Sequence, residues 1–336
     1  MREIGSEFWD VDTCAYPNSL FPKSTQWYLS GRSALQAIIA ELGWAKTVSV
    51  PAWCCDSMVK PFVDARMEVK FYPIYPDHGL TQEIDTDADV LFVMDYFGYT
   101  KGNAVSHPCI IRDTTHSIFS GWHVDADYFF GSLRKWCGVW TGGYAWAKDK
   151  HRLREGMQGE AEYICLRSEA MALKNCYING LKDMRGKPVT DKHYLDVFKE
   201  AEERLEKVGI AAASNRDIEL ARSLDVDRMK TQRRENAAIL MKAFPDMLVF
   251  PELNEQDCPM FVPILVPDGK RDLLRKYLIA KGIYCPIHWP VSKYHKVDKK
   301  SATLYIDSLS LVCDQRYSRE DMDRIVDTIH EFMEDC

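Results

Sequence analysis

DYFFGSLRKW, residues 127–136, is the stretch on which the fold prediction depends. Its aromatic run, residues 128–130, predicts a buried strand, and Gly131 begins a glycine-bounded segment that ends at residues 142–143. Lys135 therefore follows a strand end directly and stands beside aromatic side chains. Partial desolvation there favours the neutral amine, which is nucleophilic toward an aldehyde. A solvated surface lysine is the alternative.

Before this stretch, short apolar runs alternate with helical patterns. Residues 30–43 place apolar side chains at helical spacing, with Ser30 available as an N-cap and Gly43 as a stop, and residues 57–65 show a second helical pattern. The apolar runs do not alternate cleanly with polar residues, which is typical of strands covered on both faces. They lie at residues 47–50, 69–74, 90–94, 109–111, 128–130 and 144–147. The first half thus predicts an α/β fold around a mostly parallel sheet.

The second half of the chain changes its pattern twice. Residues 151–244 alternate charged and apolar side chains at helical spacing and predict a helical bridge. From Met260 an α/β pattern returns. Its strands are expected at residues 261–266, 283–287 and 308–312 and its helices at 270–282 and 318–333. We therefore expect a large domain over residues 1–235, which includes the bridge, and a small α/β domain over residues 236–336.

Composition argues against several classes of protein. The 336 residues carry a net charge of -7, so the chain lacks the cationic surplus of a nucleic-acid binder. No stretch approaches the ~18 continuous apolar residues of a membrane span, and the first residues lack the apolar core of a secretion signal. We therefore expect a cytoplasmic protein. The eleven cysteines include no C-x-x-C pair, which favours reduced thiols over a metal site.

Two polar residues follow another predicted strand. Asp113 closes the strand that contains residues 109–111, and in open α/β sheets the carboxyl ends of strands face the ligand crevice. A carboxylate there could hold the N–H of a pyridinium ring as an ion pair. Capping the following turn is the alternative. His116 lies three residues further on, so one helical turn would bring it to the same side; otherwise it is a structural histidine.

The helix start at residues 30–34, SGRSA, predicts an anion site. The first backbone N–H groups of a helix lack intrahelical partners, and here Ser33 adds a hydroxyl and Arg32 a guanidinium, so a phosphate would bind. Ser132, just before the lysine, could point its hydroxyl at the same phosphate. The alternative is that Ser30 only caps the helix. Motifs for dinucleotides and nucleoside triphosphates are absent from the sequence.

In their order, these pieces resemble the DegT/DnrJ/EryC1/StrS family of pyridoxal-phosphate aminotransferases. The family order is a G-[ST]-x-A-L helix start, a proline–aromatic strand end, an aspartate followed three residues later by His or Gln, the lysine, and a G-G pair. The matching residues are 31–35, Pro51 to Trp53, Asp113 with His116, Lys135, and 142–143. The second half adds Arg234, Asn236, IYCPIHWP at 283–290, and residues 309–326. The resemblance spans essentially the whole chain.

The resemblance implies a fold-type-I transferase with a mostly parallel seven-stranded sheet in its large domain. It implies pyridoxal 5'-phosphate as cofactor and a homodimer with active sites at the interface. Lys135 matches the lysine that carries the cofactor as a Schiff base. Asp113 matches the partner of the pyridine nitrogen, and His116 the neighbour of the ring hydroxyl.

Further site residues follow from the same resemblance. The residues that match contacts to the cofactor phosphate lie at the helix start and just before the lysine. They are Gly31, Arg32, Ser33 and Ser132. Trp53 or Cys55 would lie over the cofactor ring, and of the two only Trp53 has a flat face to stack. His288 matches a histidine that faces the substrate, and we expect it to contact the sugar together with Trp289.

The activity implied is amino transfer in two half-reactions, from a donor expected to be glutamate to the keto sugar of a nucleotide sugar. Such reactions serve cell-surface polysaccharide or secondary-metabolite biosynthesis. One alternative is a sugar dehydratase, a class that resembles these enzymes but replaces the lysine by histidine. The other is a non-catalytic homologue that acts as an interaction module. Lys135 disfavours the dehydratase, and the intact set of Asp113, His116 and Lys135 disfavours the non-catalytic homologue.

Overall fold

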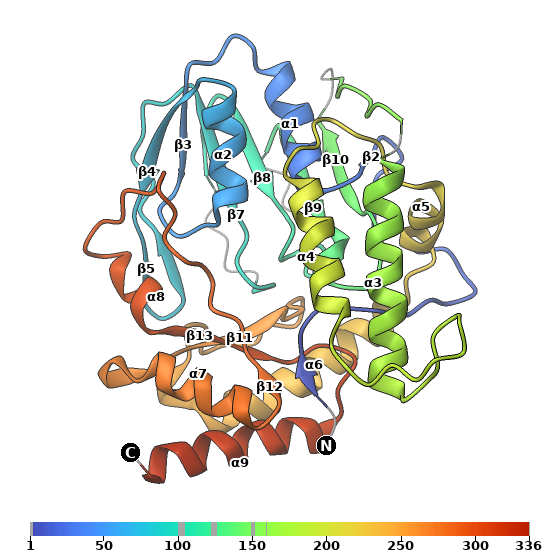
Figure 1. The fold of residues 1–336 in the computed structure, drawn as a ribbon. Helices are drawn as coiled ribbons and strands as arrows, with labels where there is room; N and C mark the ends of the chain where they lie inside the picture. Colours follow the sequence, from blue (N-terminus) through green and yellow to red (C-terminus); the bar gives the residue numbers. More distant parts are fainter. Residues whose placement is uncertain (1–2, 100–104, 122–125, 149–151, 159, 336) are drawn as a thin grey trace.

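The computed structural model describes residues 3–99, 105–121, 126–148, 152–158 and 160–335. Its centre is a seven-stranded sheet with the strand order β2-β10-β9-β8-β7-β3-β4 (Figure 1). β10 runs antiparallel to β9 and β2, and the other pairings are parallel, so the expected sheet is confirmed. The strands are β2 (Gln26–Tyr28), β3 (Thr47–Pro51), β4 (Glu68–Tyr72), β7 (Val90–Met94), β8 (Ile110–Asp113), β9 (Tyr128–Ser132) and β10 (Gly143–Ala147).

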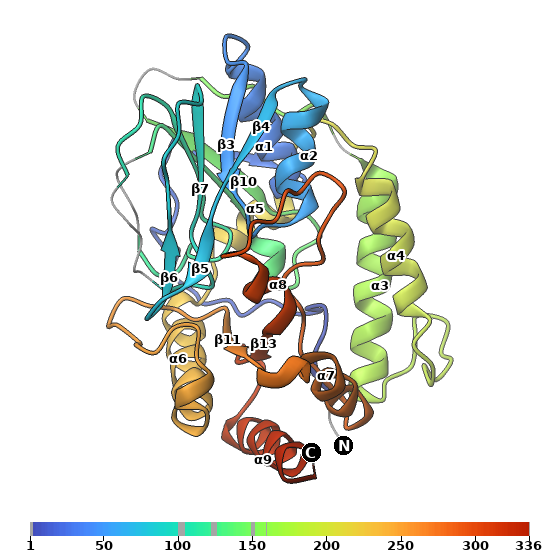
Figure 2. The same ribbon diagram turned by 90° about the vertical axis from the view of Figure 1, so that its left-hand side faces the viewer.

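Helices α1 (Gly31–Glu41) and α2 (Asp56–Asp64) lie side by side against one face of the sheet (Figure 2). The Ser30 side chain accepts a hydrogen bond from Ser33 N, so it caps α1 as expected. Apolar residues of α1, such as Leu35 and Ile38, are buried against the strands. All residues of β7 are buried, as a strand covered on both faces requires.

One expected strand is divided in the structure. The apolar run at residues 69–74 was predicted to form a single strand, but β4 ends at Tyr72. Ile74 begins a separate strand, β5 (Ile74–Pro76), which pairs with β6 (Leu80–Gln82) in a two-stranded ribbon. Pro73 stands between them and has no N–H to donate to a sheet ladder.

The C-terminal part lies below the carboxyl edge of the large sheet (Figure 1). Its antiparallel strands β11 (Phe261–Leu265) and β13 (Ser308–Val312) pack with α6, α7 and α8, and α9 packs on α6 and α7. Strand β12 is shorter than the predicted 283–287, because only two of its residues pair, with β1 at the chain start. The remaining elements here are α7 (Arg271–Ala280), α8 (Ala302–Asp307), α9 (Arg319–Asp335), β1 (Ile4–Gly5) and β12 (Ile283–Tyr284).

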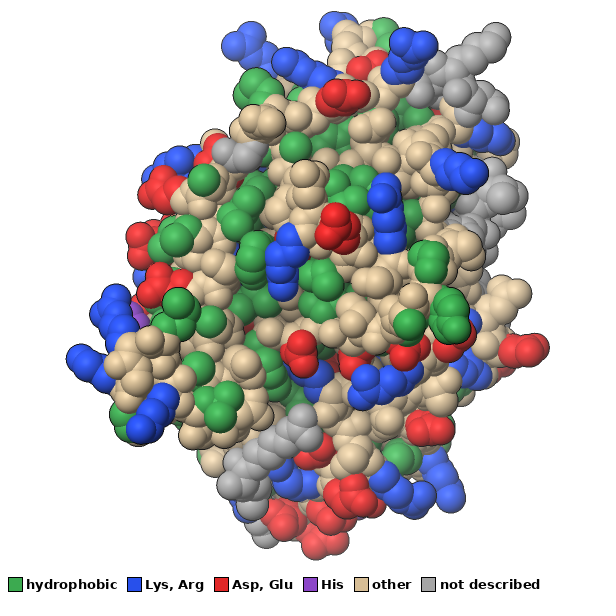
Figure 3. Space-filling model, turned by 90° about the vertical axis from the view of Figure 1, so that its right-hand side faces the viewer, with side chains coloured by type: hydrophobic (Ala, Val, Ile, Leu, Met, Phe, Trp, Pro, Cys, Tyr) green, Lys and Arg blue, Asp and Glu red, His purple; other side chains and the backbone are tan. Residues whose placement is uncertain are grey.

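The bridge is helical, as predicted. It comprises α3 (Ala161–Asn179), α4 (Tyr194–Leu205), α5 (Asn215–Arg222) and α6 (Val226–Ala243). The boundary expected between residues 235 and 236 falls inside α6, and one apolar core extends from the sheet to α9. On the face that carries α3 and α5, basic and acidic side chains are interspersed (Figure 3). No helix among the described residues combines the length and the apolar character that crossing a bilayer requires.

A buried ion pair joins the carboxyl ends of β7 and β8. Arg112 Nη1 donates to Asp95 Oδ1 at 2.6 Å, and both side chains are almost fully buried. Ser117 Oγ donates to the other carboxylate oxygen of Asp95 at 2.7 Å. Asp95 N also donates to Asp113 O at 3.1 Å. The pair therefore fixes the turn that follows β8, which carries His116.

Asp95→Asn is expected to lower the free energy of unfolding by about 3–5 kcal/mol, because it removes the carboxylate that neutralises a buried guanidinium. Urea unfolding followed by circular dichroism measures the loss. The control is Lys60→Ala, which breaks the exposed pair between Lys60 and Asp64 and should cost about 1 kcal/mol or less. Equal losses for the two variants would show that the buried pair does not organise the strand ends.

Candidate active site

Two adjoining cavities open at the carboxyl edge of the sheet, and both are lined by His116, Arg134, Lys135 and Trp289. The first, called the sheet lobe below, has a volume of about 260 Å³ and lies between the starts of α1 and α2, the ends of β8 and β9, and α4. The second, called the basic lobe, has a volume of about 430 Å³. Four arginines, the N-terminal residues 5–8 and the loop after β12 line the basic lobe.

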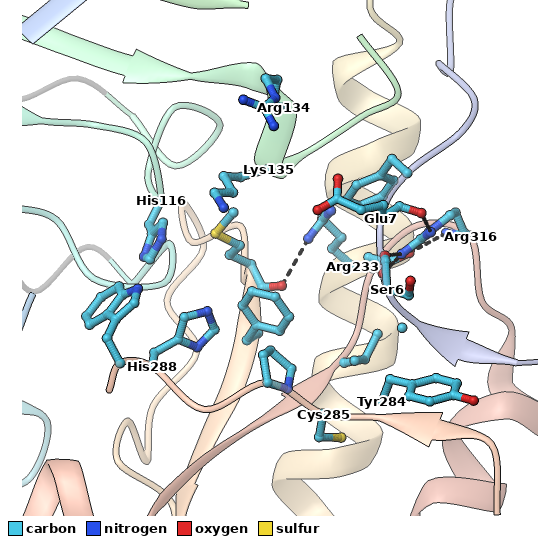
Figure 4. Close-up of a pocket in the computed structure, with 18 of the residues that line it drawn as sticks. Ser6, Glu7, His116, Arg134, Lys135, Arg233, Tyr284, Cys285, His288 and Arg316 are labelled. Atoms are coloured by element: carbon cyan, nitrogen blue, oxygen red, sulfur yellow. Dashed lines mark hydrogen bonds and ion pairs between the residues drawn. The ribbon is translucent and has the colours of Figure 1, made fainter. Parts of the chain in front are cut away.

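Lys135 lies where the two lobes meet, at the end of η1 (Leu133–Lys135), a short turn after β9. Leu133 is buried, and its N–H donates to Gly142 O at 2.8 Å. Trp136 is also buried, and its Nε1 donates to Thr115 O at 2.6 Å. Leu133 and Trp136, on either side of Lys135, are anchored in the core. The exposed Lys135 side chain therefore extends into the cavity (Figure 4).

Glycines allow the start of α1 to approach the strand that leads to Lys135. Gly143 pairs with Tyr28 and Ser132, and a Cβ atom on it would lie 2.1 Å from Ser30 O. A side chain is therefore excluded at this position. A Cβ atom on Gly31 would lie 3.3 Å from Cβ of Ser132, so the helix start and the strand end are in van der Waals contact.

Asp113 ends β8 and lines the sheet lobe, where it is 2% exposed. Its Oδ1 accepts a hydrogen bond from Thr115 N at 2.8 Å. Burial raises the pKa of Asp113 to about 6; the charge of Asp95 adds to the rise, and the hydrogen bonds from Thr115 oppose it. In the described part of the chain no cation forms an ion pair with Asp113, so its charge is available to a ligand.

His116 is 4% exposed and lines both lobes. Its Nδ1 is buried without a hydrogen-bond partner among the described residues. The ring is stacked on Trp289, with centroids 5.8 Å apart, and contacts Phe97 at 4.9 Å. Burial lowers the pKa of His116 well below its usual value, and the charges of His288 and Lys135 lower it further. The imidazole is therefore neutral, and its Nδ1 is left without a partner in the described structure.

The start of α1 forms the opposite end of the sheet lobe. Gly31, Arg32 and Ser132, three of the residues expected to contact the cofactor phosphate, line it. Arg32 Nε and Arg134 Nε are both buried without hydrogen-bond partners in the described structure. Together with the N–H groups of the helix start, they create a positive end that suits an anion. Arg134 Nη2 also forms an ion pair with Glu202 of α4, which closes this end of the lobe.

Two residues expected to contact the cofactor lie outside the cavity. Ser33 Oγ donates to Gly209 O at 2.8 Å, so its hydroxyl is occupied behind the helix start. Trp53 is fully buried and stacked on Tyr96 with centroids 5.2 Å apart, so its faces are not available to a ring in the lobe. Cys55, the other residue considered for the ring face, does line the sheet lobe.

His288 and Trp289 reach the cleft from the loop after β12. His288 lines the basic lobe, and its Nδ1 lies 2.8 Å from Ser310 Oγ. Burial lowers the pKa of His288 to about 3, and the charge of Lys135 contributes. Trp289 lines both lobes. The structure thus places this pair in the same cleft as Lys135.

Several cavity residues were not predicted from the sequence. Glu7 enters the basic lobe because β1 pairs with β12, and Arg167 of α3 binds its carboxylate at 3.1 Å. Arg233 enters from α6 and Arg316 from the loop after β13. Arg134 had a signal in the sequence, its position next to the lysine, and Arg316 lies in the segment 309–326 that resembles the family. Glu7 and Arg233 had no such signal.

No protein-family model matches the chain, and no curated protein does. Solved structures do match. PseC of Helicobacter pylori, an aminotransferase involved in the biosynthesis of pseudoaminic acid, is 13% identical with a TM-score of 0.60, over 98% of this chain and 100% of that chain. The sugar aminotransferase Spr1654 of Streptococcus pneumoniae, in its PLP form, is 13% identical with a TM-score of 0.59, over 94% and 92%.

A third match is a DegT DnrJ EryC1 StrS aminotransferase from Brucella abortus, which is 17% identical with a TM-score of 0.58, over 92% of this chain and 85% of that chain. The chain has the fold of these aminotransferases. The fold-type-I architecture implied by the sequence resemblance is therefore confirmed, and the solved structures it matches include the family that the sequence resembles. At these identities the similarity establishes the fold, and the chemistry has to be argued from the site.

Asp113→Asn is expected to stabilise the ligand-free protein at pH 8. Because burial raises the pKa of Asp113 from 3.8 to about 6, the folded state carries a penalty once the carboxyl ionises, and two pH units correspond to about 3 kcal/mol. The penalty is absent below about pH 4, where both states are protonated, grows between about pH 4 and pH 6, and stays constant at higher pH. Asparagine has no charge to bury and can still accept the hydrogen bond from Thr115.

Urea unfolding of both proteins at pH 4 and pH 8 measures this difference. The variant should exceed the wild type by up to about 3 kcal/mol at pH 8 and match it near pH 4. A wild type as stable as the variant at pH 8 would mean that another group neutralises Asp113 in the ligand-free protein.

Proposed function

We propose that this protein is a pyridoxal-phosphate-dependent aminotransferase that moves an amino group from glutamate to the keto sugar of a nucleotide sugar. The observation that supports it is the convergence of Asp113, His116 and Lys135 on the sheet lobe, opposite the start of α1. Among the matching solved structures, that of Spr1654 is described as a sugar aminotransferase in its PLP form, and that of PseC as an aminotransferase involved in the biosynthesis of pseudoaminic acid. Lys135 itself disfavours the dehydratase alternative, which the resemblance associates with histidine.

The residues of the sheet lobe fit pyridoxal phosphate. The dianionic phosphate suits the start of α1, where Arg32 Nε and Arg134 Nε are buried without partners among the described residues. At the other end, Asp113 would hold the protonated ring nitrogen, and the free Nδ1 of His116 would contact the ring hydroxyl. Lys135 stands between the two ends, where it would bind the cofactor covalently.

When bound, the cofactor supplies an electron sink for the bonds at the substrate carbon. Asp113 would keep the ring nitrogen protonated: with a pKa of about 6 it is mostly ionised at neutral pH, and a cationic partner favours ionisation further. His116 would stay neutral and bind the ring oxygen. Lys135 would move the proton between the substrate carbon and the cofactor, because it is the flexible amine at the junction of the lobes.

The basic lobe is proposed to receive the substrates. Its volume of about 430 Å³ lies within the range of small-molecule sites. His288 and Trp289 would contact the sugar from the loop after β12, with the indole offering an apolar face to a pyranose ring.

We also propose a homodimer in the cytoplasm with active sites at the interface, and a chain that divides near residue 235 into a large and a small domain. The exposed Lys135 in the single chain supports a partner that covers the cleft. Light scattering of the purified protein tests the dimer, and limited proteolysis tests the division.

Lys135→Ala is expected to abolish turnover while leaving the fold intact, because the contribution of this lysine is covalent and its side chain supports no packing. The measurement is borohydride reduction of the cofactor-loaded protein followed by peptide mass analysis. The wild type should carry reduced cofactor on Lys135, and the variant should carry none.

Lys148→Ala, at an exposed lysine beyond β10, provides the control and should behave as the wild type. Transamination by Lys135→Ala at a rate near that of the wild type would contradict the assignment, as would labelling of another lysine in the wild type.

Ser132→Ala is expected to weaken pyridoxal phosphate binding about tenfold or more, because the hydroxyl lines the sheet lobe beside Gly31 and a hydrogen bond to a charged group is lost. The matched control is Ser33→Ala, whose hydroxyl donates to Gly209 O outside the lobe. It should leave the affinity unchanged. Cofactor titration followed by absorbance compares the two variants. A loss of cofactor affinity in Ser33→Ala alone would assign the phosphate contact to Ser33 instead of Ser132.

A further inference from the structure

Arg233, in the middle of α6, is a fully buried arginine that lines the basic lobe. Its Nε donates to Gln315 Oε1 at 2.8 Å, and its Nη1 donates to Met260 O at 3.2 Å and Pro259 O at 3.3 Å. The guanidinium carbon stands 4.4 Å from the centre of the Trp136 ring. These contacts fix the plane of the guanidinium. Its Nη2 has no hydrogen-bond partner among the described residues.

The charge of Arg233 has no direct ion-pair partner in the described structure, although it contributes to the lowered pKa of the nearby Asp314. The carboxylate of Asp314 is engaged by Arg316, which donates to both of its oxygens at 2.8 Å. The carboxylate of Glu7 is engaged by Arg167. No ion pair reaches Arg233 itself within the described residues. A buried charge without a partner is costly, and the unused N–H groups on Nη2 add to that cost.

The position of this charge decides what could compensate it. Arg233 comes from α6 and shares the basic lobe with Lys135 and Arg316, whereas it does not line the sheet lobe (Figure 4). It also packs on Trp136, the residue next to Lys135. A ligand anion at Nη2 would therefore lie on the substrate side of the lysine, away from the end of the cleft suited to the cofactor phosphate.

We propose that Arg233 binds a carboxylate of the amino donor, and this rests on the proposed aminotransferase function. A planar guanidinium matches a carboxylate, and a singly charged group loses less hydration on entering a fully buried position than a phosphate does. The charge-assisted bond draws an amino acid toward Lys135 and selects against donors that lack the carboxylate. A phosphate of the acceptor is the other anion with related chemistry, and the test separates the two.

The probe is glutarate, a dicarboxylate that carries no amino group and cannot react. Calorimetric titration of the cofactor-loaded protein should show binding of glutarate and none of glutaramide, its neutral diamide. Arg233→Met should weaken glutarate binding by about 10- to 100-fold, the range expected for a lost charge-assisted hydrogen bond. Cofactor absorbance should stay unchanged, because Arg233 does not line the sheet lobe.

The matched control is Arg234→Met, one residue along the same helix. Arg234 donates to Asn254 O and Asp257 O, outside the cleft, so this variant should bind glutarate as the wild type does. Arg233→Lys keeps the charge with fewer donors and should show an intermediate loss. Arg233→Lys also provides the test if Arg233→Met does not fold, because lysine retains a cation in the same buried position.

Pyrophosphate is titrated in parallel as the phosphate probe. Three results would overturn the proposal: unchanged glutarate affinity in both Arg233 variants, equal binding of glutarate and glutaramide by the wild type, or variants that lose affinity for pyrophosphate alone. The last would assign Arg233 to a phosphate of the acceptor. Because glutarate binding requires no turnover, the titration also works on protein that proves inactive in transamination. Loss of the proposed function would then appear in the transamination assay, and loss of the carboxylate site in the titration.

Discussion

The buried ion pair between Arg112 and Asp95 is the interaction on which the site depends. It joins the carboxyl ends of β7 and β8 at the centre of the sheet, and through Ser117 it holds the turn that carries His116. The same carboxylate lies near Asp113 and helps to raise its pKa. The pair thus joins two strand ends of the sheet and adds, after the larger effect of burial, to the raised pKa of the residue proposed to hold the cofactor ring.

Several residues that line the cleft have a buried polar atom without a hydrogen-bond partner in the described structure. Among the described residues, Arg32 Nε, Arg134 Nε, His116 Nδ1 and Arg233 Nη2 are all buried, lack hydrogen bonds and line one of the two lobes. Each such group lowers the stability of the ligand-free protein. A phosphate would satisfy the arginines at the start of α1, a pyridinium ring would satisfy the buried carboxylate of Asp113, and a substrate carboxylate would satisfy Arg233.

The walls of the basic lobe come from parts of the chain that are far apart in sequence. Residues 5–8 are held there by the pairing of β1 with β12, and Arg316 donates to the carbonyl oxygens of Ser6 and Glu7. Lys174 of α3 donates to Ser6 Oγ at 3.0 Å from the other side. The start of the chain, α3 and the C-terminal part therefore meet beside Lys135, so no single local motif contains the whole lining of this lobe.

The sequence by itself determined the sheet, most of its strands and the positions of Asp113, His116 and Lys135, because each depends on local signals: apolar runs, glycines and strand ends. It also located the helix start, since capping by Ser30 is a local interaction. Only the tertiary structure decided which side chains face the cleft. Ser33 turns away because its hydroxyl donates to a backbone carbonyl, and Trp53 turns away because its ring stacks on Tyr96 in the core. Arg233 turns in because long-range packing orients α6. Side-chain direction depends on contacts between distant segments, which spacing along the chain does not encode.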